Sequence, residues 1–308
     1  MTKTILQQLS LCPNDSSIYL INKISEISGF FGHKKHLVYM VYNSEGVEHQ
    51  SLTTEYLRLN TNVEITAVKN DQQFKTGRYN VIEILPSENG YDETTVESFI
   101  NLCVAHTRFM GNSSFINFFY SLVNLFQYPR EQKFINLIGF FGELSFLNCI
   151  SGTIGNDWSD KWHASGSNDK YDIALDSCNF EIKTTMSIDE MITVKHSQLF
   201  NMDKNYLVVV VLEENNSGIT LNSLISQMHA HPNHFKSYNF ALNVEKEKKR
   251  VSPVDAAGKK FVMKSVNIYL ADQINPFKEI PDNVTNLTYK IDLLDLPTID
   301  ISNFKSEK

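Results

Sequence analysis

The alternation of apolar and polar positions predicts a β-rich first third of the chain. Residues 63–68 alternate strictly, which is typical of a strand with one buried and one wet face. Residues 37–42 and 79–85 are rich in β-branched and aromatic side chains and predict two more strands. Asp92 is placed to cap a helix with an apolar stripe. We expect a β-rich N-terminal domain over residues 1–110. Because this stretch contains no catalytic constellation, we assign it a recognition or assembly role by exclusion.

The pattern changes after a linking helix at residues 111–130, which ends near Pro129. From there it predicts the order helix, three strands, helix, strand. The apolar run at 206–212 suits the centre of a sheet covered on both faces. We expect an α/β (α+β) core over residues 131–235 and a C-terminal β extension with a basic loop over residues 236–308. The individual elements are predicted at residues 134–150, 171–176, 179–184, 191–196, 197–200 and 206–212.

Composition narrows the class without naming a function. Of the 308 residues 42% are hydrophobic and 20% charged, as in ordinary folded globular proteins. The net charge of −7 argues against a protein that coats nucleic acid, but a DNA enzyme with local basic patches remains compatible with it. Four scattered cysteines favour reduced thiols over disulfides. The N-terminus lacks a signal-peptide pattern and the 206–212 run is too short to cross a bilayer, so we expect a cytoplasmic protein without a membrane partner.

Three residues of the predicted core form a candidate metal site. Glu181 and Lys183 are two positions apart on one strand and share a face, while Ile182 points to the opposite side. A tight turn after the preceding strand would bring Asp172 across the ladder from Glu181. Hard carboxylate oxygens suit Mg²⁺ or Mn²⁺, and an adjacent ammonium can orient water or stabilise charge at phosphorus.

Glu143 is a fourth candidate, on the helix that precedes the strands. It could hold a metal-associated water or a second ion, and Gly142 beside it permits close backbone approach. An ordinary solvated helix carboxylate is the alternative for Glu143, and a solvated surface hairpin is the alternative for the Asp172–Lys183 group.

Residues 131–212 resemble the PD-(D/E)XK nuclease superfamily, the fold of many restriction endonucleases. The similarity is closest to a family of PD-(D/E)XK proteins from bacterial restriction and anti-phage loci. It rests on the segments 139–147 (GFFGELSFL), 181–185 (EIKTT) and 194–199 (VKHSQL). The superfamily's proline before the aspartate is Tyr171 here. The resemblance implies that Asp172, Glu181 and Lys183 are catalytic, that Glu143 supports them, and that Gln198 lies near the scissile phosphate.

The resemblance also implies an activity: Mg²⁺- or Mn²⁺-dependent hydrolysis of DNA, with Asp172, Glu181 and Glu143 as metal ligands. It implies a role in phage defence beside methyltransferase and ATPase proteins. Because two active sites cut a duplex most easily, we expect a homodimer or a complex assembled with such partner proteins. Two alternatives remain open: a non-catalytic nuclease-fold subunit that binds DNA or proteins, and a nuclease acting on RNA or branched DNA.

Other residues carry weaker hypotheses. Three histidines at 229–234 suggest a metal cluster but fit a polar loop better. Trp158 and Trp162 could stack on bases or anchor their loop on the core. A basic run could clamp phosphates or be a solvated loop. The candidate DNA contacts are Lys248, Lys249, Arg250 and Lys195.

Overall fold

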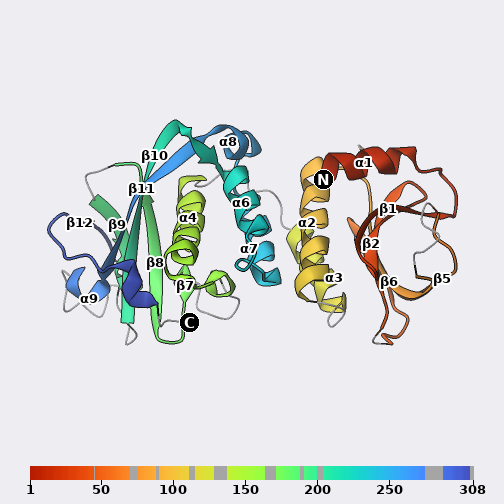
Figure 1. Cartoon of the computed structure of the whole chain (residues 1–308), viewed down its shortest axis with the longest axis horizontal. Helices are drawn as coiled ribbons and strands as arrows, with labels where there is room; N and C mark the ends of the chain where they lie inside the picture. Colours follow the sequence, from red (N-terminus) through yellow and green to blue (C-terminus); the bar gives the residue numbers. More distant parts are fainter. Residues whose placement is uncertain are drawn as a thin grey trace. The chain divides into compact units, whose positions relative to one another are not determined.

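The computed structural model describes residues 1–44, 46–69, 75–87, 90–110, 115–127, 137–163, 171–187, 191–199, 204–274 and 287–305. The chain divides into two compact units, Met1–Arg130 and Glu131–Lys308 (Figure 1). Each unit is described by itself. The predicted end of the linking helix near Pro129 lies outside the described residues, as does the stretch 164–170 before Asp172.

The first unit is built on a six-stranded antiparallel sheet with the order β1-β2-β3-β6-β5-β4. Strands β3 and β6 match two of the predicted strands, whereas β1 and β2 had no clear sequence signal. All pairings between neighbours are antiparallel. The strands are β1 (Ile18–Ser25), β2 (Ser28–His33), β3 (His36–Tyr42), β4 (Ser51–Thr53), β5 (Leu57–Ile65) and β6 (Gly77–Ile84).

Three helices complete the first unit: α1 (Thr2–Leu11), α2 (Glu93–Phe109) and α3 (Phe115–Gln127). Asp92 caps α2 as predicted, because its carboxylate accepts the N–H of Thr95 at 3.0 Å. Aromatic side chains from the sheet and from α2 and α3 pack together around Tyr39, whose ring contacts Phe30, Phe115 and Phe118. Buried aromatic surface therefore contributes to the stability of this unit.

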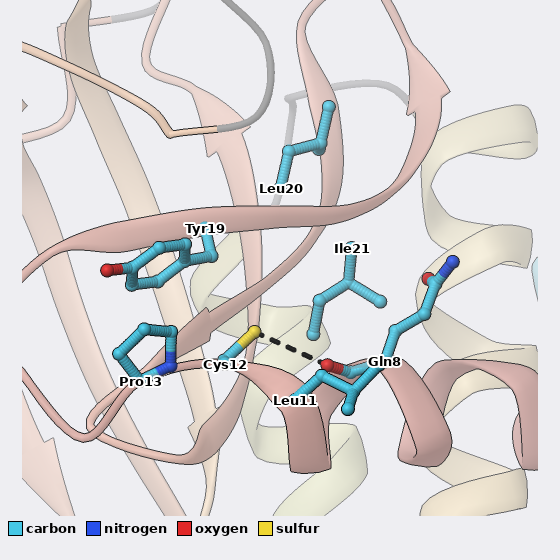
Figure 2. Close-up of a pocket in the computed structure, with 7 residues that line it drawn as sticks. All are labelled: Gln8, Leu11, Cys12, Pro13, Tyr19, Leu20 and Ile21. Atoms are coloured by element: carbon cyan, nitrogen blue, oxygen red, sulfur yellow. Dashed lines mark hydrogen bonds between the residues drawn. The ribbon is translucent and has the colours of Figure 1, made fainter.

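A pocket opens in the first unit between the end of α1 and strand β1 (Figure 2). The thiol of Cys12 in this pocket donates to the carbonyl oxygen of Gln8 at 3.5 Å, so these two polar groups of the pocket wall already bond to each other. None of the predicted catalytic residues lines it, since all of them belong to the second unit. The pocket is lined by Gln8, Leu11, Cys12, Pro13, Tyr19, Leu20 and Ile21.

The second unit is organised around strand β10 (Lys204–Thr220). The strand pairs in parallel with β8 (Cys178–Thr185) and antiparallel with β11 (Lys260–Leu270), and the sheet has the order β11-β10-β8-β7. Alternate side chains of β10 enter two different apolar cores, as expected for a strand buried on both faces. Strand β7 (Ile173–Ala174) forms the edge next to β8.

Each face of this sheet has its own cover. Helix α4 (Leu137–Ile154) contributes to the larger core together with α6 (Leu221–Ala230), on one side of the sheet in Figure 1. Strands β9 (Met191–Lys195) and β12 (Thr288–Asp292) pair with each other and contribute to the smaller core on the other side.

The order α4, β7, β8, β9, α5 (His196–Leu199), β10 confirms the predicted αβββαβ core. The predicted end of helix α4 was wrong: the helix runs to Ile154 and not to residue 150, because its extra turn places Ile154 in the larger core. Strand β9, for which no partner was predicted, pairs with β12 outside the main sheet.

The C-terminal region also differs from the expected β extension. Residues 238–258 contain helices α7 (Tyr238–Lys248) and α8 (Pro253–Gly258), and β11 joins the main sheet. The run expected as a basic loop therefore lies at the C-terminal end of α7. Ser237 begins this helix by accepting the N–H of Phe240 at 3.0 Å. The remaining short helices are η1 (Ser159–Lys161), α9 (Ala271–Ile274) and η2 (Ile301–Phe304).

Among the described residues, helix α4 is long and apolar enough to cross a membrane by composition alone. Its apolar side chains form much of the larger core of the second unit. One such helix is weak evidence for a membrane span, because a buried core helix passes the same test.

Candidate active site

The β7–β8 hairpin sets Asp172 beside the strand that carries Glu181. The turn closes where the N–H of Leu175 donates to Cys178 O at 2.9 Å, and Asp172 N donates to Phe180 O at 3.1 Å. The Asp172 carboxylate accepts the backbone N–H of Ile182 at 2.6 Å. The structure therefore brings Asp172 to the middle of β8, as the spacing predicted.

Glu181 is almost fully buried, with 3% of its surface exposed. Its Oε1 accepts hydrogen bonds from the Lys183 ammonium and from Gln198 Nε2, the latter at 2.6 Å. Gln198 Oε1 in turn accepts the backbone N–H of Lys195 at 3.2 Å. Helix α5 thus brings Gln198 to the carboxylate, and the charge of Lys195 also acts on Glu181.

Helix α4 supplies Glu143 from the opposite direction. Glu143 Oε2 accepts hydrogen bonds from Trp162 Nε1 at 2.9 Å and from His163 Nε2 at 3.0 Å. The helix approaches β8 closely at Gly142: a Cβ there would lie 2.8 Å from Thr184 Cβ and closer still to its hydroxyl. This contact shows why a glycine precedes Glu143, because any side chain would push the helix and its carboxylate away from the strand.

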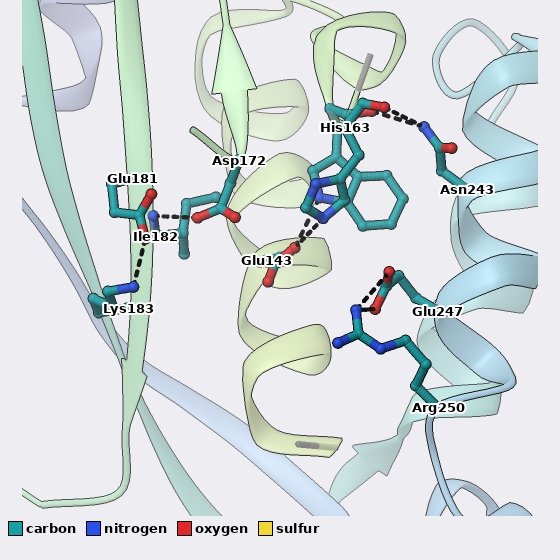
Figure 3. A network of polar contacts seen from close by, with 10 residues as sticks. Glu143, His163, Asp172, Glu181, Ile182, Lys183, Asn243, Glu247 and Arg250 are labelled. Atoms are coloured by element: carbon teal, nitrogen blue, oxygen red, sulfur yellow. Dashed lines mark hydrogen bonds and ion pairs between the residues drawn. The ribbon is translucent and has the colours of Figure 1, made fainter. Parts of the chain in front are cut away.

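Glu143, His163 and Asp172 converge on one point. One ligand atom from each lies within 4.8 Å of the others, an arrangement that can hold a metal ion. Figure 3 shows Asp172 between Glu143 and His163 on one side and the pair formed by Glu181 and Lys183 on the other. Two carboxylate oxygens and one imidazole nitrogen form a donor set that fits a divalent cation.

The electrostatics of the site also favour a cation. Burial raises the pKa of Asp172 well above its ordinary value, and the negative charges of Glu143 and Glu181 raise it further. Burial likewise raises the pKa of Glu181, although Lys183 opposes this shift. Crowded, buried carboxylates resist ionisation unless positive charge compensates them, which a divalent ion would do.

His163 is the site residue that sequence reasoning missed. Burial lowers the pKa of His163, but its hydrogen bond to Glu143 and the charge of Glu143 outweigh burial, so the net pKa is raised. Its backbone has φ of 48°, and Asn243 Nδ2 donates to the carbonyl oxygens of Trp162 and His163 at 3.0 and 3.1 Å. Histidine next to tryptophan in a polar loop carried no sequence signal for this role.

Several weaker hypotheses are now located. Arg250, drawn in Figure 3, donates two hydrogen bonds of 3.1 Å to the Glu247 carboxylate, and after Glu143 and Asp172 the charge of Glu247 also raises the pKa of His163. Lys248 lies 3.6 Å from the buried Glu245 carboxylate. Lys249 caps the end of α7 through its backbone N–H. The Glu247–Arg250 pair is therefore within electrostatic reach of His163, and these contacts give no such placement for Lys248 or Lys249.

The tryptophan and histidine hypotheses resolve in favour of the simpler alternatives. Trp158 and Trp162 are buried in the larger core, so they anchor their segment and do not present their faces to bases. His231 and His234 stack at 4.6 Å, and the His234 ring bonds to the Ser151 hydroxyl. Among the described residues, these histidines are not part of a grouping that could hold a metal.

The αβββαβ core is consistent with a PD-(D/E)XK-type α/β protein, a class that suggests a nuclease-like function. A family model described as "Putative PD-(D/E)XK family member, (DUF4420)" matches residues 124–294. This match covers more than half of the chain, so the chain belongs to that family, and the resemblance inferred from the motifs is confirmed. No curated protein and no solved structure matches the chain.

Proposed function

We propose that this protein is a metal-dependent DNA endonuclease. One observation carries the proposal: in a chain of this family the partly buried Asp172 lies beside two further carboxylates, the partly buried Glu143 and the buried Glu181, with Lys183 on the same strand as Glu181. Crowding three like charges at a site with little access to solvent costs free energy that a structural role does not require. A catalytic role explains the arrangement.

The metal would be Mg²⁺ or Mn²⁺, held by Asp172 and Glu143 with Glu181 beside them. When bound, such an ion withdraws charge from a phosphoryl oxygen and lowers the pKa of a water molecule. Asp172 is kept in position by the N–H of Ile182, and Glu143 by the indole N–H of Trp162. Each carboxylate is therefore held in a fixed orientation by a neutral N–H donor.

Lys183 and Gln198 would act on the phosphodiester itself. Both side chains donate a hydrogen bond to the same oxygen of Glu181, and this shared acceptor fixes the positions of their N–H groups. The Lys183 ammonium can orient the attacking water or stabilise the extra negative charge at phosphorus as the leaving oxygen departs. Gln198 can position a non-bridging oxygen of the scissile phosphate.

The substrate and setting are part of the proposal. The charge of Lys195 acts on Glu181, and Arg250 pairs with Glu247, whose charge acts on His163, so these two cations are the candidates to contact the backbone phosphates of DNA. The family resemblance supports a restriction-type role in anti-phage defence, in the cytoplasm, as a homodimer or with methyltransferase and ATPase partners.

The test is cleavage of unmodified plasmid and phage DNA in Mg²⁺ or Mn²⁺, with and without EDTA. Wild type is compared with Asp172→Ala and Lys183→Ala. We expect cleavage in wild type that both substitutions and EDTA abolish. RNA and branched DNA are included, so that preferential cleavage of either would redefine the substrate.

The matched controls are Asp176→Ala and Lys236→Ala. Asp176 lies in the β7–β8 turn and is 90% exposed, and Lys236 donates to the His229 carbonyl. Both should cut like wild type. If wild type binds DNA but no metal condition or added partner produces cleavage, the protein is a non-catalytic binding subunit and the proposal is wrong.

A further inference from the structure

His163 stands at the centre of the metal-ligand group, although it belongs to no motif of the nuclease core. Its Nε2 lies 3.0 Å from Glu143 Oε2. Neighbouring ligands of a six-coordinate ion bound at 2.0–2.2 Å are themselves about 3 Å apart, because the bonds meet near a right angle. The spacing of these two atoms thus matches two positions in one coordination shell, which both atoms can take once the cation displaces the proton that Nε2 shares with Glu143.

The orientation of His163 is imposed from outside the core motif. The residue adopts a left-handed backbone with φ of 48°, which a non-glycine side chain takes only when its surroundings hold it there. Asn243, on helix α7, holds both adjacent carbonyl oxygens through one amide group and is itself 7% exposed. Figure 3 shows this amide reaching from α7 to the backbone of the His163 segment.

A second hydrogen bond fixes the partner ligand. Trp162 is buried with its ring stacked on Phe140 of α4, and its indole N–H donates to the same Glu143 oxygen that faces His163. Adjacent residues 162 and 163 therefore set the carboxylate and the imidazole together. Outer groups of this kind orient ligands and contribute strongly to metal affinity.

We propose that His163 is a nitrogen ligand of the catalytic metal, that Asn243 is its positioning residue, and that the site consequently prefers Mn²⁺ to Mg²⁺. The inference rests on the proposed metal-dependent function and deepens it. Mg²⁺ favours a shell made of oxygen atoms, whereas transition ions accept imidazole more readily. A nitrogen ligand beside two carboxylates therefore favours the transition ion.

The test is pulsed electron paramagnetic resonance of Mn²⁺ bound to the full-length protein, with Mn²⁺ and Mg²⁺ affinities from calorimetry. Wild type should show modulation from an imidazole nitrogen coupled to Mn²⁺. His163→Gln should lose this modulation. It should weaken Mn²⁺ binding by about 10- to 100-fold and Mg²⁺ binding much less, so that the preference collapses.

Asn243→Ala tests the positioning role. It should retain some nitrogen modulation but lower the Mn²⁺ affinity by about 10-fold and reduce the Mn²⁺/Mg²⁺ ratio. The matched control is Asn239→Ala, an exposed asparagine on the same helix. His49→Gln, in the first unit, controls for loss of a histidine. A purely structural Asn243 would change thermal stability without changing the ratio.

The outcomes separate this inference from the proposed function. Bound Mn²⁺ without nitrogen modulation overturns the His163 assignment and leaves the nuclease proposal standing. Nitrogen modulation in a protein that cleaves no nucleic acid supports His163 as a ligand and overturns the nuclease proposal. Absence of any Mn²⁺ binding to wild type overturns both.

Discussion

The two units of this chain surround a carboxylate in opposite ways. In the first unit, Glu83 is 7% exposed and bonds to Arg58 at 2.9 Å and to the His36 ring. In the second unit, the partly buried Asp172 accepts one backbone N–H and lies beside two further acids, Glu143 and Glu181. The charge of Glu83 is matched by the Arg58 guanidinium, whereas Asp172 faces added negative charge.

This difference separates an acid that stabilises the fold from the acid to which we assign a functional role. A compensated carboxylate stabilises the fold and leaves no capacity for a ligand. A carboxylate surrounded by like charge makes folding less favourable, and the arrangement gains stability only when a cation binds. Burial alone would not distinguish Glu83 from Asp172, but the sign of the charge on the neighbouring groups does.

The largest expected effect comes from neutralising one acid in each unit. Asp172→Asn should lower the rate of DNA cleavage by about 1,000-fold, the size seen when a group that stabilises transition-state charge is lost. The same change should leave the metal-free second unit as stable as before or stabilise it by about 1 kcal/mol, since a buried charge disappears. Single-turnover cleavage and hydrogen exchange measure the two effects.

Glu83→Gln is the counterpart in the first unit and should do the reverse. Cleavage should be unchanged, and the unit should lose about 2 kcal/mol, less than for a fully buried pair because Arg58 is 41% exposed. Equal loss of cleavage in the two variants would show that the comparison does not identify the active site.

The second effect is a pH dependence confined to the first unit. Burial lowers the pKa of His106 to about 4. Its Nδ1 lies 2.9 Å from the Tyr39 hydroxyl, and its ring stacks on Phe118 at 4.2 Å. Below pH 6.5 His106 binds a proton in the unfolded chain, whereas in the folded unit it becomes protonated only near pH 4. The first unit should therefore lose about 3 kcal/mol as the pH falls from 7 to 4.

His106→Phe provides the control for this titration. The Nε2 atom of His106 has no hydrogen-bond partner among the described residues. A phenyl ring in place of the imidazole therefore breaks no hydrogen bond at that position of the ring. Amide exchange across α2, corrected for intrinsic rates, should lose most of its pH slope in the variant. The same slope in both proteins would assign the acid sensitivity to other groups.

The third effect concerns the close approach of helix α4 to the active-site strand. Gly142→Ala should destabilise the second unit by about 2 kcal/mol, because the new methyl group overlaps Thr184. It should also slow cleavage by displacing Glu143. Thermal unfolding of the metal-free protein and cleavage rates test both consequences.

Gly152→Ala on the same helix is the matched control. Nothing lies within 4 Å of a Cβ at Gly152, so alanine there should stabilise the helix by up to about 1 kcal/mol. Adding Thr184→Ala should partly rescue Gly142→Ala. Equal behaviour of the two glycine variants would contradict the close contact.

The smallest effect is on DNA affinity. Lys195→Ala and Arg250→Ala should each reduce the slope of log affinity against log salt by about 1, as expected when one phosphate contact is lost. Lys236→Ala should leave the slope unchanged. Binding is measured across a salt series with Ca²⁺ in place of the active ion, and an unchanged slope in both variants would place the DNA path elsewhere.

Much of the second unit was predictable because its signals are local. The alternation around Ile182 placed Glu181 and Lys183 on one side of a strand, and the short turn at 176–179 brought Asp172 to it. The apolar run at 206–212 predicted a strand buried on both faces, which is where β10 lies. The helix α7 was missed even though Ser237 and the Phe240–Val244 spacing indicate it.

By itself, the sequence determined the order of elements in the nuclease core and the identity of the acids and the lysine in its motif. It did so because strand alternation and tight turns act over a few residues. Only the tertiary structure decided that His163 joins Glu143 and Asp172, and that Asn243 holds it there. These contacts join residues 20 and 80 positions apart. Packing of helices against a sheet creates such contacts, and local periodicity carries no record of them.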